Sequence, residues 1–142
     1  MVLAVLQFLL GTGGLYGGYM LLKDVSGRLL GLPEGLLDRL PIDTYLIPGL
    51  ILIIFNGILP LVTVIGLLRK ETLTALNRLN VLPKYYWAYS WTLFNAGFLI
   101  CWTLGELILW GVNFLSVLYL IWGIVTFLLC LLPKATGYYR KG

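Results

Sequence analysis

Four long apolar stretches dominate this chain, and they constrain its fold more than any other feature. They cover about residues 1–22, 44–68, 86–110 and 112–132. Each is long enough to cross a hydrocarbon core of about 30 Å as an α-helix, which takes about 20 residues. Backbone groups in lipid must be hydrogen-bonded within the protein, so such stretches are helical. We therefore predict an all-α fold, an integral membrane four-helix bundle that forms one domain over residues 1–142.

The composition fits this prediction. Only 11% of the residues are charged and 60% are hydrophobic, whereas about a quarter of the residues in a soluble domain are charged. The charges cluster between the apolar stretches, in 23–43, in 69–84 and after Pro133. The chain has a net charge of +4. Such an excess of Lys and Arg is expected in a membrane protein, because cytoplasmic loops are rich in these residues. We expect the lipid bilayer as the partner and no nucleic acid, because no basic stripe lies on a soluble module.

The orientation follows from the basic residues. The 69–85 loop holds four Lys and Arg residues and the C-terminal tail three, against three in the 23–43 loop and none in the 111–113 link. Because basic loops stay inside, both termini and the 69–85 loop are predicted to be cytoplasmic at the cell membrane. The first stretch has no basic segment before it, so we interpret it as a retained helix and not a signal peptide. Leucines mixed with charges predict short interfacial helices in the 23–43 and 69–85 loops.

Several chemistries are excluded by the residue types present. The chain contains no histidine, so a histidine-ligated haem, a histidine zinc site and a Ser-His-Asp triad cannot form within it. Cys101 and Cys130 lie at depths predicted to differ by over about 10 Å, too far apart for a disulfide. We therefore expect no catalytic residue, metal site or cofactor.

Glycines in the first stretch point to close helix packing. Gly13 and Gly17 share one helix face, and Gly14 and Gly18 share another, because each pair is separated by three residues. Small residues at this spacing let a second helix approach closely. A cavity or a closely bound ligand beside the glycines is the alternative interpretation.

The second and third stretches each carry a polar stripe. Tyr45, Asn56 and Thr63 lie along one face of the second helix, in which Pro60 predicts a kink near 56–60. These stripes are predicted to face the interior, because polar groups in hydrocarbon are costly unless paired. On the third helix, the interior stripe comprises Trp91, Asn95, Trp102 and Glu106, and the opposite, lipid-facing stripe Leu93, Ile100, Leu104 and Leu107.

Asn56 and Asn95 are both predicted near the membrane midplane. We expect them to hydrogen-bond directly or through a shared partner. Such a bond contributes about 0.6–2 kcal/mol between membrane helices. The favoured interpretation is a structural contact that holds the two helices together, and contact with a ligand or ion is the alternative.

Glu106 is the only acidic residue within the four stretches. It lies four residues before Trp110, about 6 Å along the helix axis, so an arginine of the 23–43 loop can reach it. We predict an ion pair with Arg28 or Arg39. A proton-binding or substrate-binding role is the alternative.

One pattern is shared with known proteins. The segment DVSGRLLGLP at 24–33, followed by YLIPGLIL at 45–52, resembles a group of small bacterial four-span membrane proteins. This resemblance implies four spans and a bacterial origin, and it implies no activity or catalytic residue. The general layout is also similar to that of DoxX-like proteins, although no motif supports that link. Small multidrug transporters carry their essential glutamate in the first helix, where this chain has none.

Three functions are compatible with the sequence. The favoured one is a structural or accessory subunit that acts through helix contacts, with a membrane-protein partner or as a homo-oligomer. The second is a binder or transporter of a small or lipidic molecule, and the third is a non-haem enzyme subunit acting on a lipid or quinone. A continuous cavity reaching Asn56, Asn95, Trp102 and Glu106 would favour the second function.

Overall fold

The computed structural model describes residues 1–32, 35, 37–70, 74–112 and 114–141. The described chain is helical and forms no strand, apart from one isolated bridge. The four long helices are α1 (Val2–Lys23), a continuous second helix made of α2 (Leu46–Ile51), η3 (Leu52–Ile58) and α3 (Leu59–Arg69), then α5 (Trp87–Trp110) and α6 (Phe114–Leu131). Each of the four is long and apolar enough to cross a membrane. The predicted all-α class and the four apolar helices are thus confirmed.

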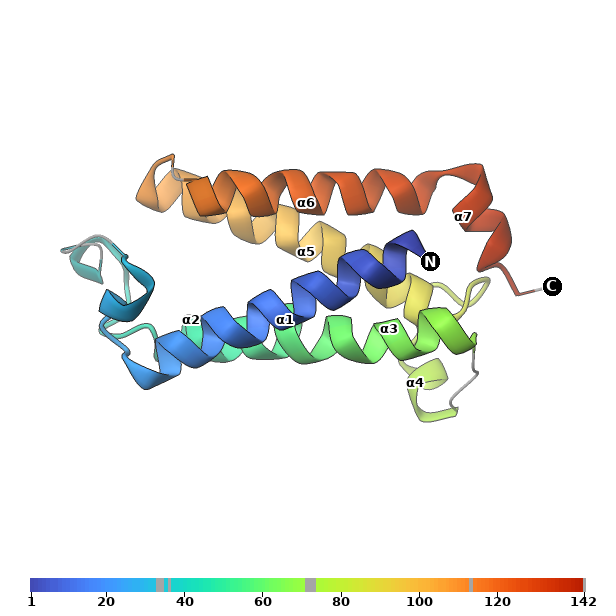
Figure 1. The fold of residues 1–142 in the computed structure, drawn as a ribbon, viewed down its shortest axis with the longest axis horizontal. Coiled ribbons are helices and arrows are strands. Elements are labelled where there is room, and N and C mark those ends of the chain that lie inside the picture. Colours follow the sequence, from blue (N-terminus) through green and yellow to red (C-terminus); the bar gives the residue numbers. More distant parts are fainter. Residues whose placement is uncertain (33–34, 36, 71–73, 113, 142) are drawn as a thin grey trace.

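The long helices run the length of the molecule (Figure 1). Both termini and the segment between α3 and α5 lie at one end, which we call the terminal end. The 24–45 loop and the α5–α6 link lie at the other, the loop end. Short helices occupy both ends: η1 (Arg28–Leu30), η2 (Leu37–Arg39), α4 (Thr74–Arg78) and α7 (Pro133–Tyr138). Residues 71–73 of the predicted 69–85 interfacial helix lie outside the described residues.

An apolar cluster closes the terminal end. Its buried members are Leu3, Ala4, Leu67, Trp87, Ala88, Tyr89, Cys130 and Tyr139. The C-terminal tail completes this cluster, because the backbone N–H of Tyr86 donates to the carbonyl of Tyr139 at 3.0 Å and that of Lys141 to the carbonyl of Lys84 at 2.8 Å. The tail is therefore bound to the segment that precedes α5.

Glycine contacts bring α1 against the second helix. A Cβ atom placed on Gly14 would lie 2.0 Å from the carbonyl oxygen of Asn56, and one on Gly18 would lie 2.9 Å from that of Gly49. Gly17, in contrast, has open space beside it. The predicted packing role thus applies to the Gly14 and Gly18 face, where the two backbones touch.

The second helix is irregular over Leu52–Ile58, a range that overlaps part of the kink predicted at 56–60. Leu52–Ile58 is a π-helix that ends two residues before Pro60. Proline has no backbone N–H, so it cannot supply the α-helical bond to the carbonyl four residues earlier, that of Asn56. That carbonyl oxygen faces Gly14 of α1. π-helical turns of this kind recur at functional sites.

Helix α5 packs against other helices on more sides than its predicted interior and lipid-facing stripes indicate. It packs against both the second helix and α6. Ile100, expected to face lipid, contacts Gly123 of α6, and Leu93 packs against the terminal-end cluster. Leu104 is exposed, as expected. A helix with neighbours on two sides needs apolar contact surface on its aliphatic side as well.

The two halves of the DVSGRLLGLP and YLIPGLIL pattern meet in the fold. The carboxylate of Asp24 accepts hydrogen bonds from the hydroxyl of Ser26 at 2.5 Å and its backbone N–H at 3.1 Å, which lowers the pKa of Asp24. Gly27 follows in the left-handed region at φ 79°, and a side chain there would collide with the ring of Tyr45. The turn therefore packs on the beginning of the second helix. Pro33 lies outside the described residues.

The burial of Tyr45 predicts that the fold becomes less stable at alkaline pH. Tyr45 is 1% exposed, and burial raises the pKa of its phenol. As the pH rises above about 10, the unfolded chain loses this proton while the folded chain retains it, so the free energy of unfolding falls. We expect Tyr45→Phe to flatten this decline in thermal unfolding measured between about pH 9 and 11. The exposed Tyr19 gives a control, because Tyr19→Phe should leave the wild-type decline unchanged.

Candidate functional site: a cavity at the loop end

A cavity of about 490 Å³ opens at the loop end, between α1 and the second helix on one side and α5 and α6 on the other. It forms because α1 and α6 diverge from the terminal end toward the loop end (Figure 1). Most of its lining is apolar, with Leu21, Leu52 and Leu99 among the contributors. The fold therefore contains a sizeable space among the helices.

The rim of the cavity comes from three elements. Leu30, Gly31 and Leu32 of the 24–33 pattern line it at the loop end. Tyr16 of α1 is 63% exposed and Phe114 of α6 is 79% exposed, and both also line the cavity. Exposed lining residues stand on α1 and α6, and also at Gly31 of the loop and Val112 of the α5–α6 link. The cavity is therefore open both between α1 and α6 and toward the loop end.

The two glycine faces of α1 have different roles. Gly13 and Gly17 line the cavity, Gly18 packs on the second helix, and Gly14 does both. A Cβ atom on Gly13 would approach the hydroxyl of Tyr119 across the space, at 2.9 Å. The absence of side chains on Gly13 and Gly17 therefore keeps the cavity wide.

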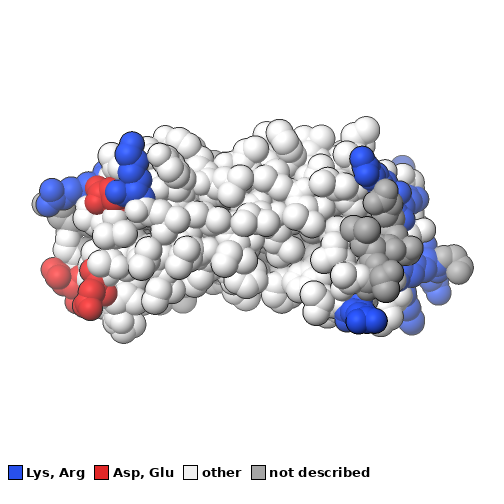
Figure 2. Space-filling model, turned by 90° about the horizontal axis from the view of Figure 1, so that it is seen from below, with Lys and Arg blue, Asp and Glu red and all other residues white. Residues whose placement is uncertain are grey.

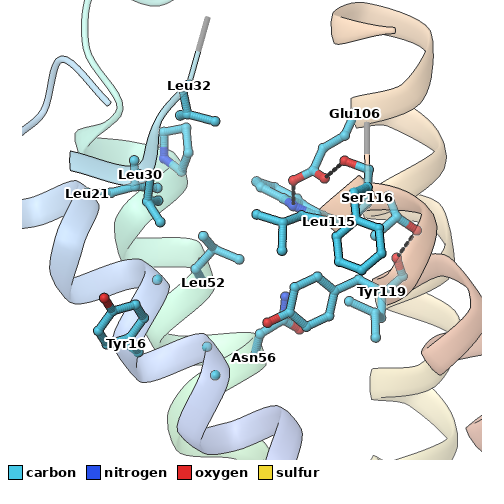
Figure 3. Close-up of a pocket in the computed structure, with 18 of the residues that line it drawn as sticks. Tyr16, Leu21, Leu30, Leu32, Leu52, Asn56, Glu106, Leu115, Ser116 and Tyr119 are labelled. Atoms are coloured by element: carbon cyan, nitrogen blue, oxygen red, sulfur yellow. Dashed lines mark hydrogen bonds between the residues drawn. The ribbon is translucent and has the colours of Figure 1, made fainter. Parts of the chain in front are cut away.

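Glu106 is the acidic group of the cavity wall (Figure 3). One carboxylate oxygen accepts a hydrogen bond from the indole N–H of Trp102 at 2.6 Å, and the other accepts one from the hydroxyl of Ser116 at 2.7 Å. Trp102 stacks on Phe98 at 5.9 Å between ring centroids, and Phe98 stacks on Phe55 at 4.8 Å. The carboxylate is thus held by α6 and by an indole that aromatic packing positions.

The structure gives Glu106 different partners from those predicted. Arg28 and Arg39 are exposed, and neither lines the cavity. Arg28 instead lies near Asp24, where its charge contributes to lowering the pKa of that carboxyl. The α5–α6 hairpin supplies Ser116, so the carboxylate turns toward α6 and not toward the 24–45 loop.

Asn56 and Asn95 lie at the contact between the second helix and α5. The side-chain amide of Asn95 donates to the backbone carbonyl of Phe55, the residue before Asn56. The side-chain carbonyl oxygens of both asparagines are buried without a hydrogen-bond partner, so the two amides are not bonded to each other. Asn56 lines the cavity, whereas Asn95 is fully buried. Thr63 is buried too, and its hydroxyl donates to the carbonyl of Pro60 in its own helix at 2.7 Å.

A second cavity of about 280 Å³ adjoins the first. Leu40 and Ile42 of the 24–45 loop and Cys101 of α5 line it. Pro48, Trp102 and Glu106 line both cavities. These three side chains therefore lie between the two cavities.

Sequence reasoning missed part of this site. Ser116 and Tyr119 of α6 were not singled out, although their three-residue spacing places them on one helix face near the end that carries Glu106. The rim residues Leu30–Leu32 were seen only as part of a loop pattern. Both cysteines are free, with Cys130 buried. Within the described ranges, no group of three or more acidic, cysteine or histidine side chains is placed to hold a metal ion.

Comparison with known proteins gives no relationship to build on. No protein-family model, curated protein or solved structure matches this chain.

Proposed function

We propose that this chain is a multi-pass protein of the cell membrane that binds a small lipidic molecule in the cavity at the loop end. One observation carries the proposal: an apolar space of about 490 Å³ that has Glu106 and Asn56 in its wall. Small-molecule sites typically measure about 300–1,000 Å³, with mostly apolar linings and a few polar groups. The cavity matches that description in volume and chemistry.

The surface supports membrane insertion as a four-helix bundle. Large apolar side chains are exposed along all four long helices, among them Phe8, Ile54, Phe94 and Ile121. Exposed apolar areas of this extent are typical of surfaces that contact lipid or protein. Figure 2 shows an uncharged middle, acidic and basic side chains at the loop end, and basic side chains at the terminal end. The basic end is the cytoplasmic one in our proposal.

The route to the cavity supports a ligand that comes from the bilayer. One side of the opening lies between α1 and α6, where Tyr16 and Phe114 are exposed. In an inserted protein, this side faces acyl chains. A ligand that partitions into the membrane can then reach Glu106 without crossing water.

The first test is retention of a ligand by the purified protein. We expect native mass spectrometry in mild detergent to detect one small lipidic molecule on each chain. Gly17→Leu should reduce the occupied fraction by about tenfold, because the new side chain extends into the cavity where Gly17 has open space. The thermal stability of this variant should stay near that of the wild type.

Gly97→Leu is the matched control. Gly97 also has open space beside it, and it lines neither cavity. This variant should retain the ligand as the wild type does. Wild-type protein that carries no small molecule and copurifies with a stoichiometric protein partner would contradict the proposal and favour the accessory-subunit function.

A further inference from the structure

We infer that the ligand carries a positively charged amine, which pairs with the carboxylate of Glu106. This inference rests on the proposed function and specifies the chemical class of its ligand. The apolar part of the molecule occupies the leucine-lined space, and the ammonium group occupies the end formed by α5 and α6.

The charge balance of the cavity is the first argument. Glu106 is the only acidic residue in the four long helices. Among the described lining residues of both cavities, none is a lysine or an arginine. Trp102 and Ser116 donate hydrogen bonds to the carboxylate, but both donors are neutral. A carboxylate in an apolar surrounding is costly without an opposite charge, and a cationic ligand supplies that charge.

The aromatic lining is the second and independent argument. Trp102, Phe114 and Tyr119 all line the same cavity as Glu106. Aromatic faces attract ammonium groups through the ring quadrupole, and clusters of them recognise amines in proteins. A carboxylate beside aromatic rings is therefore better suited to an organic cation than to a neutral or acidic group.

The cavity has room for the long apolar chain of such a ligand. Figure 3 shows Glu106 with Ser116 on one wall, and Leu21, Leu30 and Leu52 on the opposite side. The open space beside Gly17 extends this cavity along α1. An alkylamine can thus place its charge at Glu106 and its chain along the second helix and α1.

A neutral lipid alcohol is the competing ligand. It can donate a hydrogen bond to the same carboxylate and place the same chain in the same space. Because the alcohol is neutral, it forms no ion pair with Glu106, and the aromatic rings do not attract it as they attract a cation. Matched chains with different head groups therefore distinguish the two ligand classes.

The test compares dodecylamine with dodecanol on the delipidated full chain in a neutral maltoside detergent at pH 7. We expect the amine to bind at least about tenfold more tightly, measured by native mass spectrometry or tryptophan fluorescence. Glu106→Gln keeps the size of the side chain and removes its charge, so it should reduce the preference to within about twofold. Gly97→Leu should keep the wild-type preference.

Each contrary result has a distinct meaning. Equal binding of amine and alcohol by the wild type overturns the amine inference and leaves the proposed function standing. Failure of both probes to bind overturns the inference and the proposed function together. If Glu106→Gln does not fold, Tyr119→Leu replaces it: weaker binding of the amine alone supports the inference, and an equal effect on both probes overturns it.

Discussion

Gly14→Leu is expected to prevent the native packing of α1. A Cβ atom at this position would lie 2.0 Å from the carbonyl oxygen of Asn56 and 2.8 Å from the backbone nitrogen of Gly57. These are backbone atoms of a packed helix, so neither can move aside as a flexible side chain does. Leucine has a higher helix propensity than glycine by up to about 1 kcal/mol. Overpacking against a backbone costs about 1–3 kcal/mol or more, so the clash outweighs the propensity.

The measurement is thermal unfolding in mild detergent, followed by circular dichroism. We expect the apparent Tm to fall by on the order of 10 °C, or the variant to aggregate on purification. Gly17→Leu is the matched control, because Gly17 lies one turn further along α1 and has no atom near its Cβ position. Equal Tm values for the two variants would show that Gly14 does not contact the second helix.

Tyr139→Ala is expected to open the terminal end. The side chain of Tyr139 is 4% exposed, and its ring stacks with that of Tyr89 at 5.5 Å between centroids. The carbonyl of Tyr139 also accepts the backbone N–H of Tyr86. Removing a buried aromatic ring costs about 3–5 kcal/mol in lost burial and contacts. The tail then loses the anchor that keeps it against the beginning of α5.

Tyr138→Ala provides the comparison for this prediction. Tyr138 is the preceding residue and is 56% exposed, and its ring contacts the ammonium group of Lys70. An exposed contact of this type contributes below about 1 kcal/mol. We expect Tyr139→Ala to raise proteolysis of the C-terminal tail and to lower the Tm, and Tyr138→Ala to do neither. A tail cleaved equally in both variants would contradict the anchoring role.

Much of the helical architecture was predictable because hydropathy is a local property. The four apolar stretches correspond to the four long helices, with ends close to those predicted. Helical periodicity also predicts burial, and Tyr45, Asn56 and Thr63 are all buried. The proline effect at Pro60 is local as well, since it depends on a missing N–H, although the π-helical form of Leu52–Ile58 was not predicted.

The candidate site was predictable only in part. Asn56, Trp102 and Glu106 line the cavity, and the polar stripes of their helices had singled them out. Ser116 binds Glu106 from ten residues further along the chain, across the turn between α5 and α6. Arg28 and Arg39, the predicted partners of Glu106, lie in the 24–45 loop and do not line the cavity. Which of two nearby segments reaches a carboxylate depends on how the helices pack.

The sequence by itself determined which segments are helices, where they end and which of their faces are polar, because these properties arise within single segments of chain. Only the tertiary structure decided that Gly14 and Gly18 contact the second helix, whereas Gly13 and Gly17 do not and border the cavity, which Gly14 also lines. The two pairs have the same spacing and differ only by a rotation about the helix axis. Their roles depend on the direction in which α6 diverges from α1, and that direction is set by the packing of all four helices together.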